Sequence, residues 1–272
     1  MVKLVLIDID GTLMNDEKTI PPENLQAIEW CITHEIPVTL VTGRNYHTCL
    51  DVLSLLKEDV PVVFQNGALI YQHLSGKVLK QVFLPSDIAS MILLHTKDIL
   101  SRILYLNSLE REDMWMIKPY QGPYEIYFHR NNERIRFVSD FHTLPLHEVT
   151  EIVLLDTERN LQNTLQPVLE KYAGQFSPIK SFEMQNEIFF ELFGPEVSKG
   201  KAALFLSEHF HTPLQNILFI GDSYNDIEIM DLVGYPVAMG NAVEEVKAKA
   251  RFITKSNNEA GVSSAIHHLI QK

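Results

Sequence analysis

Cysteine is scarce in this chain, with only Cys31 and Cys49 among 272 residues. Two thiols are too few for a disulfide framework or for a cysteine-rich metal site. Each lies within an amphipathic stretch, where a free cysteine behaves as a small apolar side chain. We therefore expect two buried free thiols and no disulfide.

Lysine and arginine are also few relative to aspartate and glutamate. The chain has 23 lysine and arginine residues against 35 aspartate and glutamate residues, and its formal net charge is -12. Binding to nucleic acid or to an anionic membrane needs clustered lysine and arginine, so we expect neither partner. An anionic small molecule remains compatible with this composition if a metal or a few local cations outweigh the overall field.

Long hydrophobic runs are missing as well, and no run approaches the length that spans a bilayer. The amino-terminal run from Leu4 to Ile7 is interrupted at once by Asp8, which makes it too short for a signal peptide. We expect a cytoplasmic protein. Apolar residues nevertheless make up 46% of the chain, which suits a large globular core, and the length favours two domains.

Short apolar runs that lead into a polar residue beside a glycine recur along the chain. They end at Asp8-Ile9-Asp10-Gly11, Thr42-Gly43-Arg44, Gln65-Asn66-Gly67, Gly221-Asp222 and Gly240-Asn241. Continuous apolar runs of this kind indicate strands that are buried on both faces of a parallel sheet. The predicted fold is a doubly wound α/β sheet, in which these corners converge outside the carboxyl ends of the strands.

The segments between the runs carry helical spacing. Pro21 and Pro22 can open a helix. The three-and-four spacing of Leu25, Ile28 and Ile32 then predicts that these side chains face the core.

The pattern changes between residues 84 and 187. Two helical patterns, over 87–100 and 159–172, mix here with strand-like runs. The strand-like runs cover 103–106, 124–128, 151–155 and 187–192. None of these ends in a polar-glycine corner. We expect a core of residues 1–83 and 188–272 and an inserted, smaller α/β domain with a more antiparallel sheet over 84–187. Five aromatic residues of this domain either line a substrate pocket or, as is more common for such a stripe, belong to the core: Trp115, Tyr120, Tyr124, Tyr127 and Phe128.

The carboxylates at two of the strand ends indicate a metal site. Asp8 and Asp10 follow one buried strand, and Asp222 and Asp226 follow another. Four acids that face one another strongly disfavour joint ionisation unless a cation is present. Mg²⁺ takes such oxygen ligands and also accepts a phosphate oxygen.

The order of the motifs resembles the haloacid dehalogenase superfamily. The chain carries Asp8-Ile9-Asp10-Gly11-Thr12-Leu13, Thr42-Gly43-Arg44, Asn66-Gly67, Val197-Ser198-Lys199-Gly200 and Gly221-Asp222-Ser223-Tyr224-Asn225-Asp226. More narrowly, it is similar to the Cof-type phosphatases, whose cap domain (of the C2 type) is inserted between the second and third motifs. The resemblance covers the core, whereas the cap matches only in length and position.

The resemblance implies a magnesium-dependent phosphatase that acts on small phosphorylated metabolites, such as sugar phosphates or phosphorylated cofactors. Asp8 would attack phosphorus and form an aspartyl-phosphate, and Asp10 would act as acid and then as base. The metal ligands would be Asp8, Asp10 through its backbone carbonyl, Asp222 and Asp226, the last directly or through water.

The resemblance also implies a phosphate-binding set, Thr42, Gly43 and Lys199. Lys199 stands in a predicted first helical turn that Ser198 can cap, a place where the helix dipole disfavours a cation. A functional reason for Lys199 follows from its neighbouring motifs, whereas Lys201 has none.

Three further residues keep two interpretations each. Asn66 is a turn residue or a phosphate contact, Arg44 pairs with the phosphate or with a core acid, and Asn225 forms a turn or steadies the acidic loop.

Two departures from the family pattern stand out. Ile229 replaces a common methionine, and Ala260 stands where the family often has an aspartate. If that acid contacts the cap or a metal-bound water, cap closure differs here.

Two other functions stay open. One is a phosphometabolite-binding regulatory protein that does not hydrolyse its ligand, and the other is a phosphosugar mutase that transfers the phosphoryl group. Substrate, oligomeric state and pathway are not legible in the sequence.

Overall fold

The computed structural model describes residues 1–54, 56–107, 109 and 113–271. The chain divides into two compact units. The first comprises Met1–Arg44, Cys49–Lys80 and Ser198–Lys272, and the second comprises Asn45–Thr48 and Gln81–Val197. The second unit is thus mostly one continuous insertion into the chain of the first.

The first unit is built on a five-stranded parallel sheet with the strand order β14-β13-β12-β1-β2. β1 lies between β12 and β2, and every residue in it is buried. A parallel bridge from Val41 to Val63 leads on to the three strands of a smaller sheet, β3-β4-β5, in which β3 and β4 are antiparallel. The strands of the unit are β1 (Leu4–Ile7), β2 (Val38–Leu40), β3 (Pro61–Phe64), β4 (Leu69–Gln72), β5 (Lys77–Gln81), β12 (Ile217–Gly221), β13 (Tyr235–Ala238) and β14 (Phe252–Ile253).

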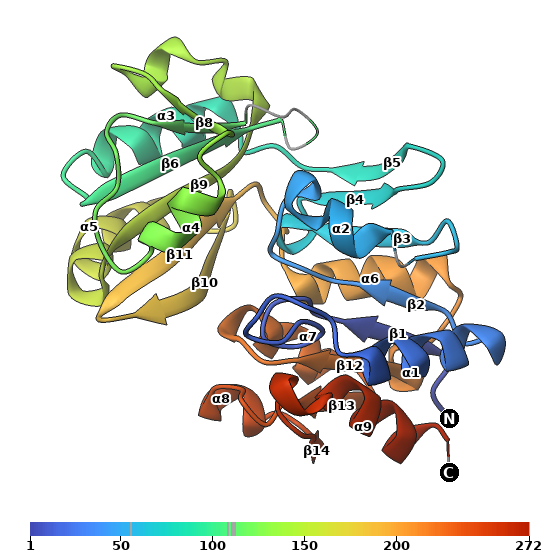
Figure 1. Ribbon diagram of the computed structural model, residues 1–272. Helices are drawn as coiled ribbons and strands as arrows, with labels where there is room; N and C mark the ends of the chain where they lie inside the picture. Colours follow the sequence, from blue (N-terminus) through green and yellow to red (C-terminus); the bar gives the residue numbers. More distant parts are fainter. Residues whose placement is uncertain (55, 108, 110–112, 272) are drawn as a thin grey trace. The chain divides into compact units, whose positions relative to one another are not determined.

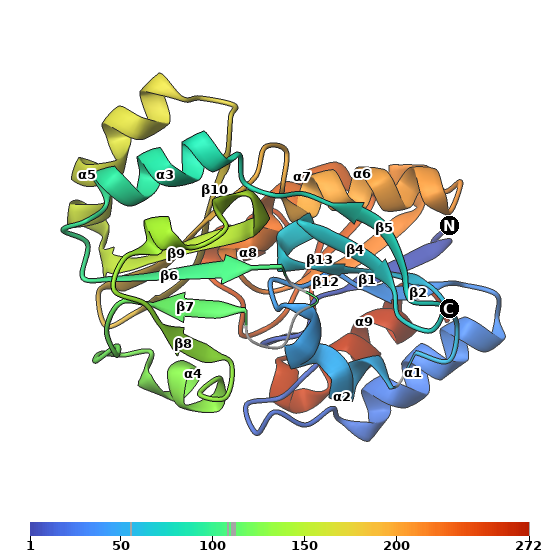
Figure 2. The ribbon, with the colours of Figure 1, turned by 90° about the horizontal axis from the view of Figure 1, so that it is seen from above.

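Helices cover both faces of the parallel sheet, as a doubly wound fold requires. Figure 2 shows α1 and α9 on one side of the strands and α6 and α7 on the other. The helices of the unit are α1 (Pro22–Thr33), α2 (Leu50–Leu53), α6 (Lys199–His209), α7 (Ile227–Leu232), α8 (Glu244–Lys247) and α9 (Gly261–Leu269). The predicted fold class is confirmed, and Cys31 and Cys49 are buried free thiols.

The second unit contains a six-stranded sheet with the order β10-β11-β9-β6-β7-β8, antiparallel except between β7 and β8. One face packs on α3 and α5, and the other carries an aromatic cluster that includes Tyr120, Tyr124 and Phe128. In Figure 1, α3 and α5 lie along the same face of this sheet. The elements are α3 (Ser86–His95), β6 (Ser101–Leu106), β7 (Met114–Met116), α4 (Glu125–Arg130), β8 (Ile135–Phe137), β9 (Val149–Thr157), α5 (Glu158–Lys171), β10 (Ser177–Met184) and β11 (Glu187–Phe193).

Two local predictions differ from the structure. The strand expected over 124–128 is helical instead: Tyr124 is the N-cap of α4, and it enters the aromatic cluster together with Phe128, four residues later. The burial predicted for α1 holds in part, because Ile28 is buried whereas Leu25 and Ile32 are half-buried, and the other buried residues are Asn24, Ala27 and Cys31. Asn24 is buried because its amide donates to the Leu13 carbonyl and accepts from the Ser263 amide.

The bounds of the second unit differ from the expected range of 84–187. β11 pairs with β9 from Glu187 to Phe193, and this pairing extends the unit to Val197.

Among the described helices, none combines the length and the apolar character needed to cross a bilayer.

Candidate active site

The candidate site lies at the carboxyl ends of strands in the first unit. β1 and β12 are adjacent and in register, with Ile7 opposite Ile220, so the residues that follow each strand emerge side by side. Asp8 therefore stands next to Asp222. Asp226 returns to the same place at the end of a short 3₁₀ helix, η6 (Tyr224–Asp226).

Three carboxylates meet here around one lysine. One ligand oxygen each of Asp8, Asp222 and Asp226 lies within 4.8 Å of the other two. The ammonium group of Lys199 lies 2.7 Å from Asp8 Oδ1 and 2.6 Å from Asp226 Oδ1. Lys199 is only 1% exposed, although it begins α6, and Ser198 caps that helix as predicted, by accepting from the Lys201 amide. The lysine is buried because it neutralises part of the acidic cluster.

One ammonium group does not balance three carboxylates. The pKa of Asp8 is raised to about 7, because burial, the largest cause, and the charges of Asp226 and Asp10 together outweigh the opposing effect of Lys199. Burial, followed by the charges of Asp8 and Asp226, raises the pKa of Asp222 well above its usual range. The cluster therefore favours an added cation or an added proton.

The donor set fits a hard divalent cation. Thr12 Oγ1 donates to Asp222 Oδ1 at 2.7 Å, whereas Asp226 Oδ2 accepts from the amides of Asp222 and Ser223. Within the described residues, Asp8 Oδ2 and Asp222 Oδ2 accept no hydrogen bond. A carboxylate oxygen that accepts from no donor is a suitable ligand for a cation such as Mg²⁺. Both oxygens of Asp226 are already engaged, which suits an indirect role at the metal.

The Asp222 carboxylate occupies space that is free only because residue 11 is a glycine. A Cβ atom at this position would lie 2.4 Å from Asp222 Oδ2, and the backbone φ of 71° lies in the left-handed region. Any side chain here would displace the carboxylate, so the glycine of the first motif is required by the second acidic corner.

Asp10 has cationic partners of its own. Arg44 forms a bidentate ion pair with it, Nε to Oδ2 at 2.6 Å and Nη2 to Oδ1 at 2.7 Å, and Lys18 Nζ lies 2.7 Å from Oδ1. Burial raises the pKa of Asp10, but the hydrogen bonds and charges of Arg44 and Lys18 outweigh it and hold that pKa well below its usual range. Of the two interpretations of Arg44, this structure contains the pairing with a core acid.

The remaining predicted residues form a polar patch. Thr42 is buried, and its hydroxyl accepts from the Arg44 amide. Asn225 Nδ2 donates to Asn66 Oδ1 at 2.9 Å, and a Cβ atom on Gly43 would lie 3.4 Å from each of these two atoms. Asn225 Oδ1 is buried and has no partner among the described residues. These side chains are brought together, but their proposed contacts to phosphate stay predictions.

Sequence reasoning missed two residues of the site, Thr12 and Lys18. Thr12 is fully buried and lies within the first motif, so its position beside Asp10 and Gly11 was the available signal. Lys18 lies in a loop and carries no pattern in the sequence. Its φ of 60°, unusual for a lysine, is visible only in the structure.

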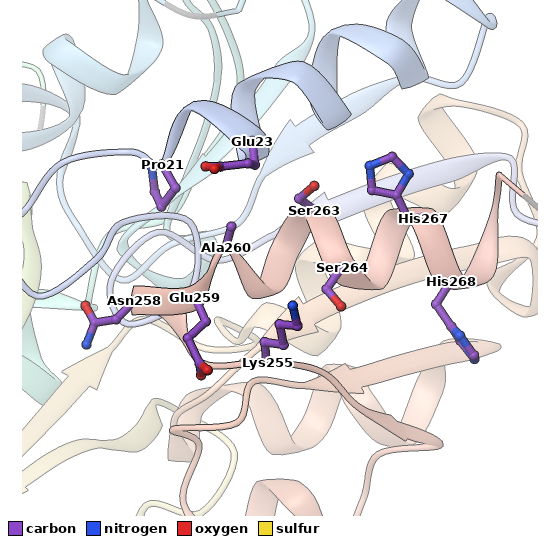
Figure 3. Close-up of a pocket in the computed structure, with 10 residues that line it drawn as sticks. All are labelled: Pro21, Glu23, Lys255, Asn258, Glu259, Ala260, Ser263, Ser264, His267 and His268. Atoms are coloured by element: carbon purple, nitrogen blue, oxygen red, sulfur yellow. The ribbon is translucent and has the colours of Figure 1, made fainter.

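A separate hollow lies on the first unit between the start of α1 and α9. Figure 3 shows its lining side chains, among them Pro21, Glu23, Lys255 and His267. It includes none of the predicted site residues. His267 and His268 are exposed on α9, and His268 stacks on Phe252.

Comparison with known proteins adds a family model. Residues 5–266 match the model described as haloacid dehalogenase-like hydrolase.

Curated relatives align over nearly the whole chain. The putative phosphatase YxeH of Bacillus subtilis is 28% identical, with 99% of each chain covered. The 5-amino-6-(5-phospho-D-ribitylamino)uracil phosphatase YcsE of Bacillus subtilis is 29% identical, with 99% of this chain and 96% of that protein covered. Among solved structures, TM0651 from Thermotoga maritima is 26% identical with a TM-score of 0.79 and covers 99% of this chain and 98% of its own.

Proposed function

Because the chain belongs to the haloacid dehalogenase-like hydrolase family, we propose that it hydrolyses small phosphate monoesters with the help of Mg²⁺. The observation that carries the proposal is the acidic cluster, where one lysine pairs with two of three carboxylates and two carboxylate oxygens accept no hydrogen bond from any described residue. Phosphoryl transfer relies mainly on positioning and on neutralising charge at the phosphoryl oxygens, and these residues are suited to both tasks.

In the proposed first step, Asp8 Oδ2 attacks phosphorus. A bond forms between this oxygen and phosphorus while the bond from phosphorus to the ester oxygen breaks, which leaves an aspartyl-phosphate. Asp8 Oδ1 accepts from Lys199 at 2.7 Å and keeps a second lone pair for the cation, so Oδ2 is available for the attack. The bound cation would neutralise charge on the phosphoryl group.

In the proposed second step, Asp10 removes a proton from water, the water oxygen attacks phosphorus, and the bond from phosphorus to Asp8 Oδ2 breaks, which releases inorganic phosphate. Asp10 would also have supplied the proton to the departing alcohol in the first step, which it enters in its protonated form, because the negative charge of the bound phosphate ester opposes the effect of Arg44 and Lys18. Thr42, the Gly43 amide and Lys199 would bind the phosphoryl oxygens. Asn66 and Asn225 lie close enough to Gly43 to extend this set.

Small phosphorylated metabolites, such as sugar phosphates or phosphorylated cofactors, are the proposed substrates. One reported relative is named as a phosphatase of 5-amino-6-(5-phospho-D-ribitylamino)uracil, a phosphorylated small molecule. Selection among such substrates is assigned in this proposal to the second unit, as the family resemblance implies.

The test is release of inorganic phosphate from a panel of sugar phosphates and phosphorylated cofactors, with Mg²⁺ and with a chelator. We expect release only with the metal, and a loss of about 10⁴-fold or more in the Asp8→Asn variant. Lys201→Met, a change at an exposed lysine on the same helix as Lys199, is the control and keeps full activity. Binding without release across the panel, or phosphate that appears on an added sugar acceptor, would contradict the proposal.

A further inference from the structure

Lys18 contacts the candidate acid and base directly, yet no motif includes it. Its ammonium group lies 2.7 Å from Asp10 Oδ1, and its side chain is 39% exposed. Exposed ion pairs add little to stability. Stability alone therefore does not explain why this lysine points at Asp10.

The backbone around Lys18 is arranged to present this side chain. Lys18 has a φ of 60°, in the left-handed region that residues with a Cβ atom rarely adopt. The turn is closed at Asn15, whose amide donates to the Thr19 carbonyl and whose carbonyl accepts from the Lys18 amide. The Asn15 side chain also accepts from the Thr19 amide at 2.9 Å. Strained backbone that is held this firmly is typical of functional positions.

The hydrogen bonds of Asp10 leave its two oxygens in different states. Oδ1 accepts from Lys18 and from Arg44 Nη2, whereas Oδ2 accepts only from Arg44 Nε. A carboxylate oxygen has two lone-pair sites. Within the described residues, Oδ1 is therefore saturated and Oδ2 keeps one site for a proton.

We propose that Lys18 is a positioning residue, which together with Arg44 fixes the Asp10 carboxylate so that Oδ2 exchanges the proton with the leaving group. This inference rests on the proposed phosphatase function and adds to it a residue and an atom. Without Lys18, the second lone pair of Oδ1 is open, and the carboxylate is held by Arg44 alone.

The step that depends on this arrangement is cleavage of the ester. The bond from phosphorus to the ester oxygen breaks as Asp8 bonds to phosphorus, and the ester oxygen takes the electron pair together with the proton that Oδ2 of protonated Asp10 carries while the negatively charged phosphate ester is bound. An alkyl leaving group needs this proton, whereas a nitrophenolate leaves without it. A defect in the position of Asp10 therefore lowers the rate for alkyl phosphates selectively.

The experiment compares kcat/KM for an alkyl phosphate that the panel identifies as a substrate with kcat/KM for p-nitrophenyl phosphate. This parameter covers only the steps through the first phosphoryl transfer, so hydrolysis of the intermediate does not obscure the comparison. The variants are Lys18→Met, Lys18→Arg and Lys18→Gly. Lys57→Met is the matched control, because it breaks an exposed ion pair of similar geometry, with Glu29 at 2.8 Å.

We expect Lys18→Met to lower kcat/KM about tenfold for the alkyl phosphate and at most about twofold for p-nitrophenyl phosphate. Lys18→Arg should restore most of the loss, and Lys57→Met should change neither value. Lys18→Gly should show the same selective loss while its thermal midpoint holds or rises, because glycine adopts a positive φ without strain. A selective loss of activity without a loss of thermal stability distinguishes positioning from a merely structural role.

An equal loss on both substrates, or no loss, would overturn the role of Lys18 and leave the proposed function intact, since the wild-type protein would still release phosphate. If the wild-type protein releases phosphate from neither compound, the proposed function and this inference fall together.

Discussion

Both units bury charged side chains, but they balance them differently. In the second unit, Asp113 accepts from Arg134 Nε at 2.9 Å and from Nη2 at 2.8 Å, and its Oδ2 also accepts from Asn45. In the first unit, Lys199 pairs with two of three clustered carboxylates, and Asp8 and Asp222 each keep an oxygen that accepts from no described residue. One site is a closed pair, whereas the other has an excess of negative charge.

The pKa shifts follow the same division. Burial raises the pKa of Asp113, and every other contribution, from Arg134 and Asn45 among them, lowers it. At Asp8 and Asp222 burial is again the largest effect, but neighbouring carboxylates raise the pKa further. A buried pair whose groups satisfy each other serves the structure, whereas a buried cluster with unbalanced charge is suited to binding a cation.

The same isosteric substitution should therefore have opposite effects in the two units. Asp113→Asn leaves Arg134 without its counter-charge and should lower the free energy of unfolding by about 3 kcal/mol. Asp222→Asn removes one of the mutually repelling carboxylates and should raise that free energy by about 1 kcal/mol in chelator. Denaturant titrations of both variants in chelator make the comparison.

Magnesium sharpens this test. A ligand at 100 times its dissociation constant stabilises the folded state by about 2.7 kcal/mol. We expect a Mg²⁺-dependent rise of this kind in wild type and in Asp113→Asn, and little rise in Asp222→Asn. If Asp222→Asn destabilises the metal-free protein as Asp113→Asn does, the acidic cluster is an ordinary structural network.

The sequence predicted the part of this comparison that depends on strand ends. Polar residues that follow buried runs mark the carboxyl edge of a parallel sheet, and Asp8 and Asp222 meet there because Ile7 and Ile220 are in register. The closed pair in the second unit was not predictable. No sequence pattern predicts the contact between Asp113 and Arg134, because it depends on the folded arrangement of β7, α4 and β8.

The local errors in predicted secondary structure and burial share one cause, because tertiary contacts override the pattern of side chains along the sequence. Residues 124–128 are rich in aromatic side chains, which favour strands, yet the core on this face of the sheet accepts them as part of α4. In α1 the apolar spacing predicted Ile28 correctly, but Leu25 and Ile32 are half-buried, and the polar Asn24 is buried because its side chain is hydrogen-bonded on both sides. The position of Lys18 depends on a left-handed turn, for which the sequence offers no glycine.

The excess charge also predicts a pH dependence. The folded pKa of Asp8, about 7, lies above its ordinary value of 3.8. Between these values the folded state binds more protons than the unfolded state. The contribution of Asp8 to stability is therefore complete below pH 3.8 and is lost as the pH rises through about 7.

In chelator, we expect this effect to lower the free energy of unfolding by about 1 kcal/mol between about pH 6 and pH 8. The measurement is the difference between wild type and Asp8→Asn in denaturant titrations across this range, which cancels the histidines common to both. Saturating Mg²⁺ should abolish the difference between the two proteins in how the free energy of unfolding changes with pH, because the cation supplies the missing charge. Equal slopes for both proteins in chelator would contradict the raised pKa.

The smallest expected effect lies in the first unit, away from the acidic cluster. Ala260 precedes α9 with φ 55° and ψ 47°, and its side chain makes no cap to the helix. An alanine in the left-handed region is strained, whereas asparagine tolerates it. Ala260→Asn should raise the free energy of unfolding by about 0.5 kcal/mol, while the Mg²⁺-dependent rise and the rate of phosphate release stay as in wild type. This outcome would show that the acid often found at this position in the family serves the backbone. A changed response to Mg²⁺ would instead connect position 260 with the metal, and the acidic cluster would no longer account alone for the difference between the units.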